Sequence, residues 1–127
     1  MNVLLARTVL LLAAVPSLVL ACGVCIEDKV AATYDHAVLT KAKAKNHVVV
    51  FGAIDGAGNA SKAGTRIAAV AGDVKGVQRG ATLTSAEPPA FSFVLDPRAQ
   101  APEAAIADLQ KRLDMPGLRL TFIRVMP

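Results

Sequence analysis

The sequence predicts an α+β domain built on a four-stranded sheet, and three observations indicate this class. Segments of strand and helix type follow one another over residues 47–126 in the order strand, helix, strand, strand, helix, strand. Residues 47–54 are apolar on both faces, which is typical of a central strand that is covered on two sides. Residues 90–95 place Phe91 and Phe93 on one face, as alternation along a strand requires.

The first segment, residues 1–21, is predicted to be a secretory signal peptide. Arg7 supplies a short positive region, residues 8–20 form an apolar run, and residues 19–21 offer a cleavage site. The apolar run is shorter than the roughly 20 residues that span a bilayer. A buried N-terminal helix is the alternative, but the segment lacks the polar face of such a helix. We therefore expect a periplasmic or secreted chain that begins at Cys22.

The charge of the chain is mild and argues against nucleic acid as a partner. Removing residues 1–21 takes away one arginine and no acid, so the formal net charge falls from +4 to +3. Lys41, Lys43 and Lys45 form the only basic cluster, and no aromatic residue lies among them. Nucleic-acid binding usually needs a broader basic stripe or stacking rings.

No Ser-His-Asp order or pair of carboxylates stands out, so we expect no enzyme other than a thiol oxidoreductase.

The elements in the first half of the chain are predicted as follows. Residues 26–45 form one helix, because Ile26, Val30 and Tyr34 recur at helical spacing and acidic residues lie in the first turn. The strand at residues 47–54 follows. A glycine-containing loop leads to a second helix over residues 61–74.

The second half begins with a strand over residues 77–85, whose polar side chains suit an edge position. A proline turn leads to the strand at residues 90–95. Pro102 opens a helix in its favoured first turn, and residues 115–117 end that helix. Residues 118–125 form the last strand.

This order contains two split βαβ units, which is the ferredoxin-like signature. It predicts a ferredoxin-like domain over residues 47–127, with the first and third strands in the centre of the sheet. The two helices of such a domain cover only one face of the sheet. We therefore expect the extra helix, within a leading segment of residues 22–46, to pack on the other face or on an edge.

Two short motifs resemble the heavy-metal-associated domain family. Residues 74–77, Val-Lys-Gly-Val, are similar to the family's turn into its second strand, and residues 93–97 resemble the end of its third strand. The resemblance covers residues 47–126 and implies a ferredoxin-like carrier of copper or another soft metal. The family's Met-x-Cys-x-x-Cys loop corresponds to residues 55–61, which contain no cysteine, methionine or histidine. No metal ligand carries over from the family.

The pair Cys22-Gly-Val-Cys25 contains both cysteines of the chain and is the sharpest chemical feature. Two thiols at this spacing before a helix can converge, and the helix N-terminus stabilises thiolates. Such a pair suits Cu(I), whereas zinc, the less favoured ion, normally takes four ligands. His36 and His47 are the candidate auxiliary ligands. A single helix over residues 26–45 would place His36 about 16 Å along the axis from Cys25, too far to close the site.

The main hypothesis is an exported soft-metal protein that binds Cu(I) through Cys22 and Cys25 and transfers it to a partner protein. A thiol–disulfide redox protein and a structural disulfide use the same pair, since exported compartments permit disulfides. The third alternative is a lipoprotein, because residues 19–22 form an imperfect lipobox. Acylation of Cys22 would anchor an interaction module to a membrane and would leave no thiol pair.

Overall fold

The computed structural model describes residues 26–56 and 58–127, which form a ferredoxin-like α+β fold. Its strands are β1 (Val48–Asp55), β2 (Leu83–Ala86), β3 (Pro89–Leu95) and β4 (Arg119–Met126). They pair in the antiparallel order β2-β3-β1-β4. The predicted central position of the first and third strands is therefore confirmed.

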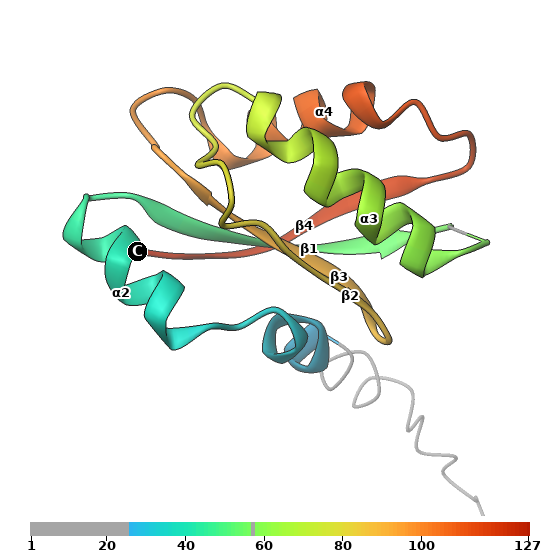
Figure 1. Ribbon diagram of the computed structural model, residues 1–127, viewed down its shortest axis with the longest axis horizontal. Coiled ribbons are helices and arrows are strands. Elements are labelled where there is room, and N and C mark those ends of the chain that lie inside the picture. The colour runs from blue at the N-terminus through green and yellow to red at the C-terminus, as the bar shows by residue number, and fades with distance from the viewer. Residues whose placement is uncertain (1–25, 57) are drawn as a thin grey trace, which may run out of the picture.

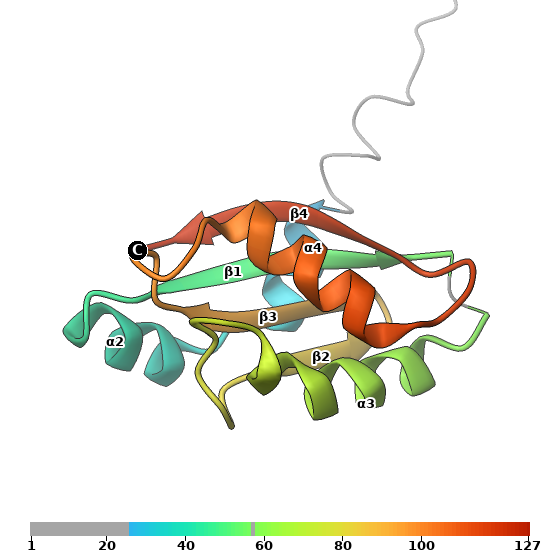
Figure 2. The same ribbon diagram turned by 90° about the horizontal axis from the view of Figure 1, so that it is seen from above.

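Two helices cover one face of the sheet, α3 (Ala60–Val70) and α4 (Pro102–Leu113) (Figures 1 and 2). A 3-10 turn, Ala71–Asp73, extends α3 where the sequence predicts continued α-helix. The predicted apolar stripes of these two helices pack against the sheet and form the main core. Its largest fully buried side chains come from α3, α4 and the two central strands: Val50, Ile67, Phe91, Phe93, Leu95, Leu109 and Leu113.

The opposite face of the sheet is covered by the N-terminal part of the described chain, as expected (Figure 1). Residues 26–32 are helical, and α2 (His36–Ala44) follows them. A second core forms between this layer and the central strands. It contains Val30, Ala42, Val49, Phe51 and Val94. The leading segment therefore completes a three-layer sandwich in which both faces of the sheet are buried.

The prediction of one helix over residues 26–45 is wrong, because the chain turns at residues 33–35. The backbone of Asp35 is extended, with φ of −139°, and its Oδ1 accepts a hydrogen bond from the Val38 amide at 3.1 Å. Asp35 thus caps the start of α2. The two residues that seemed to extend the apolar stripe, Ile26 and Tyr34, are 43% and 46% exposed. The apolar spacing alone hides the break, whereas the aspartate marks it.

The predicted strand over residues 77–85 is also too long at its start. Regular pairing with β3 begins only at Leu83. Val77 forms an isolated bridge with Leu95, and the chain then leaves the sheet at Gly80, whose φ is +81°. Since a left-handed residue interrupts an extended run, the segment is divided into a bridge, a loop and a short edge strand. The predicted edge position of this strand is confirmed.

No helix among residues 26–56 and 58–127 is long and apolar enough to cross a membrane.

Candidate functional site

Cys22 and Cys25 lie outside the described residues, together with the predicted signal peptide and lipobox. The described chain begins at Ile26, the residue that follows Cys25. The part of the site that can be built from the structure is therefore the helical segment of residues 26–32, to which the cysteine pair is joined.

Three contacts fix this segment to three adjacent strands. At its first turn, the guanidinium of Arg124 on β4 donates to both carboxylate oxygens of Glu27, with Nη1 3.3 Å from Oε2. In its middle, Val30 is buried in the second core beside Phe51 of β1. After it, the Thr33 carbonyl accepts a buried hydrogen bond of 3.0 Å from Oγ of Ser92 on β3. The residues after the cysteine pair thus have a defined position over the centre of the sheet.

The ion pair of Glu27 and Arg124 sets the charge state at the start of this segment. Hydrogen bonds from Arg124, followed by its positive charge, hold the pKa of Glu27 below its ordinary value of 4.5. The same contacts raise the pKa of the Arg124 guanidinium. The carboxylate therefore remains ionised to a lower pH than a free glutamate does. Its contribution to the position of the segment is fully present above about pH 4.5 and is lost as the pH falls through the lower, folded-state pKa.

We expect Arg124→Gln to return the pKa of Glu27 to the range of a free glutamate. The guanidinium supplies both the hydrogen bonds and the charge that lower this pKa, and glutamine supplies no charge. The measurement is the carboxyl carbon shift of Glu27 by NMR as a function of pH. Arg112→Gln is the matched control, because Arg112 pairs with Asp108 on α4. Identical Glu27 titrations in Arg124→Gln and in the unmodified chain would contradict the pairing.

His36, the first of the two candidate auxiliary ligands, is exposed at the first residue of α2. The turn before α2 removes the single axis on which a 16 Å separation from Cys25 was predicted, so that separation does not apply. His47 lies between α2 and β1, and its amide donates to the Ala42 carbonyl at 2.8 Å.

His47 lies far from the beginning of the helical segment of residues 26–32. Glu27 contacts Arg124, which pairs with Phe51 in the sheet. Phe51 lies four residues beyond His47, which corresponds to about 13 Å along a strand. His47 therefore does not lie near Glu27, in the first turn of the helical segment that follows the cysteines.

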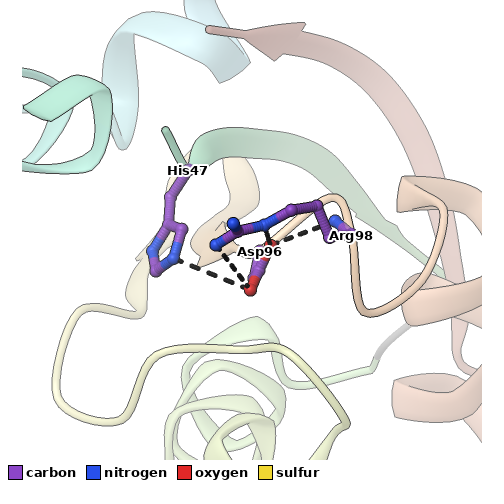
Figure 3. A network of polar contacts seen from close by, with 3 residues as sticks. All are labelled: His47, Asp96 and Arg98. Carbon is purple, nitrogen blue, oxygen red and sulfur yellow. Dashed lines mark hydrogen bonds and ion pairs between the residues drawn. The ribbon is translucent and has the colours of Figure 1, made fainter. Parts of the chain in front are cut away.

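Instead, His47 faces a carboxylate that is already engaged by an arginine (Figure 3). Its Nε2 is 3.9 Å from Oδ2 of Asp96, while Oδ1 of Asp96 accepts from the amide and from Nε of Arg98, at 3.0 and 3.1 Å. Hydrogen bonds from the Arg98 side chain and then from its amide lower the pKa of Asp96. The network joins the start of β1 to the end of β3, and a cavity of about 330 Å³ lies beside His47.

Across the part of the chain that the structure describes, no three His, Cys, Asp or Glu side chains gather in a way that could hold a metal ion. Comparisons with family models, curated proteins and solved structures found no match to this chain. The resemblance to the heavy-metal-associated family therefore stays a prediction. The sequence does not predict the Glu27–Arg124 pair, because the two residues are 97 positions apart in the chain and no local pattern joins them.

Proposed function

We propose that this chain is an exported soft-metal protein whose cargo is Cu(I), bound by the thiolates of Cys22 and Cys25. The observation that carries the proposal is the position of the pair in the chain. Both cysteines of the protein lie in one Cys-x-x-Cys sequence, directly before a helical segment that is held to β4, β1 and β3. Two thiolates next to such a fixed segment can bind one ion together, and the rest of the domain does not have to rearrange.

The chemistry of the pair favours Cu(I) over zinc. Thiolates are soft ligands that select Cu(I), and two of them suffice for a linear site. Zinc normally takes four protein ligands in a closed site. A partner protein takes the Cu(I) by ligand exchange, in which its ligands replace Cys22 and Cys25. No change in the oxidation state of the metal is needed for this step.

The chemical state of Cys22 is the first measurement to make. Intact mass spectrometry of the protein recovered after export is expected to give the mass of residues 22–127 without an added lipid. A lipid adduct on Cys22 would turn its sulfur into a thioether and overturn the proposal in favour of a membrane-anchored module.

Cu(I) uptake is the direct test. The reduced protein is titrated into a coloured Cu(I)–bicinchoninate complex under anaerobic conditions. We expect the protein to bleach the complex with a stoichiometry of one Cu(I) per chain. A protein that leaves the complex intact at a large excess would overturn the proposal.

Thiol–disulfide exchange is the second candidate, because Cys-x-x-Cys is also the usual redox spacing. It requires one thiol with a pKa well below the ordinary value of about 8.5. The rate of alkylation as a function of pH measures this quantity. A chain that takes up no Cu(I) but has one acidified thiol would support disulfide exchange.

A further inference from the structure

A groove lies on the outer helical layer, on the face of the sheet opposite to residues 26–32. It has a volume of about 780 Å³ and runs between α3 and the end of α4 with the loop that follows. This volume is within the roughly 300–1,000 Å³ of small-molecule sites. The residues that line the groove are Lys62, Thr65, Arg66, Ala69, Leu113, Asp114, Met115 and Pro116.

One wall of the groove is cationic. Lys62 and Arg66 are one helical turn apart on α3, so their side chains lie on the same side of the helix. Neither forms an ion pair with any acidic side chain of residues 26–56 and 58–127. Four other arginines in the same ranges do form such pairs. The two cations are therefore available to an anion that enters from solvent.

The floor of the groove is apolar and adaptable. Leu113 is fully buried beneath it, and Met115 is half-buried against the main core. The thioether side chain of methionine is flexible and fits differently shaped apolar groups. Asp114, with φ of +47°, ends α4 at the rim and is the one acidic residue among the described residues that line the groove.

We propose that this groove binds a small amphipathic carboxylate. The apolar body of the ligand packs on Met115 and Pro116, above the buried side chain of Leu113. The carboxylate accepts hydrogen bonds from Lys62 and Arg66, and such charge-assisted bonds are stronger than neutral ones. Asp114 opposes a second negative charge, which favours a monoanion. This site is separate from the thiol pair and does not depend on the proposed metal function.

The test uses 4-phenylbutyrate as the probe and its neutral amide, 4-phenylbutanamide, as the matched compound. Amide shifts of the purified chain are followed by NMR while each compound is added. We expect saturable shifts from the carboxylate that are confined to α3 and the residues after α4, with binding at least about fivefold weaker for the amide. Equal binding of the two compounds, or shifts spread over the whole domain, would overturn the proposal.

Variants of opposite sign sharpen the test. The double change Lys62→Gln with Arg66→Gln is expected to weaken binding of 4-phenylbutyrate at least about fivefold, and Asp114→Asn to strengthen it. Asparagine tolerates the left-handed backbone at this position. Lys41→Gln with Lys45→Gln changes the net charge equally on the other side of the molecule, and we expect it to leave binding unchanged. An equal loss in this control pair would show non-specific attraction and overturn the proposal.

Discussion

Gly52→Ala is expected to lower the free energy of unfolding by about 3 kcal/mol, the upper part of the range for overpacked cores. Gly52 lies in the middle of β1, opposite Phe91 of β3. A Cβ atom at this position would lie 2.5 and 2.9 Å from Cε1 and Cε2 of the Phe91 ring, and closer still to Cζ. Phe91 is fully buried and stacked on Phe93, with ring centroids 6.0 Å apart, so the ring has little room to move.

Chemical denaturation of the variants measures this cost, and a double-mutant cycle identifies its source. Gly58→Ala is the control, because an added Cβ there meets no atom within 4 Å. In a Phe91→Leu background, the smaller side chain leaves space for the new methyl group. We expect the cost of Gly52→Ala to fall by more than half in that background. Additive effects of the two changes would contradict the assigned contact.

The sequence predicts the phenylalanine face of β3 but not the requirement for Gly52. Alternation along one strand is a local pattern, and it correctly places Phe91, Phe93 and Leu95 in the main core. The close approach of Gly52 to Phe91 depends on which strands pair and in which register. No local pattern contains that information, so the sequence alone gives no reason for a glycine in this apolar strand.

The error in the N-terminal layer, one helix in place of two, is of the opposite kind, because here the sequence does contain a local signal. The apolar spacing of residues 26–45 conceals that signal. Asp35 is a favoured N-cap residue, and the apolar residues of α2 follow it. Giving the cap more weight than the spacing of Ile26, Val30 and Tyr34 would have divided the helix correctly. The sequence still restricts this layer to the second face or an edge of the sheet, because the two helices of a ferredoxin-like domain leave the second face open.

The candidate site also has one part that can be predicted from the sequence and one part that cannot. The thiol pair is a local motif, so its chemistry can be proposed from sequence. The contacts that support the adjoining segment join Glu27 to Arg124 and Thr33 to Ser92. They arise only when the N-terminal layer lies across the sheet, and they could not be derived from spacing or composition. The cationic groove also depends on folding, since its lining comes from α3 and from the end of α4 with the loop that follows.

For the thiol pair, we expect Cys22→Ser and Cys25→Ser each to lower the affinity for Cu(I) by about 100-fold or more. Each variant removes one of two soft ligands and leaves a hard hydroxyl, which Cu(I) binds poorly. The loss should therefore reach or exceed the roughly 10- to 100-fold that removal of a second-shell partner costs at a metal site. Competition with bicinchoninate under reducing conditions measures both variants against the unmodified chain.

His47→Asn is the informative control for these variants. His47 directly precedes β1 and lies about 13 Å along the strand direction from Phe51, the sheet partner of Arg124. Its loss should therefore leave the affinity for Cu(I) within about twofold. His36→Asn tests the other histidine, which the turn at residues 33–35 leaves exposed at the start of α2. Equal thermal unfolding of all four variants would show that the affinities report ligation and not loss of the fold. If either serine variant kept the full affinity for Cu(I), the ion could not be held between the two sulfurs.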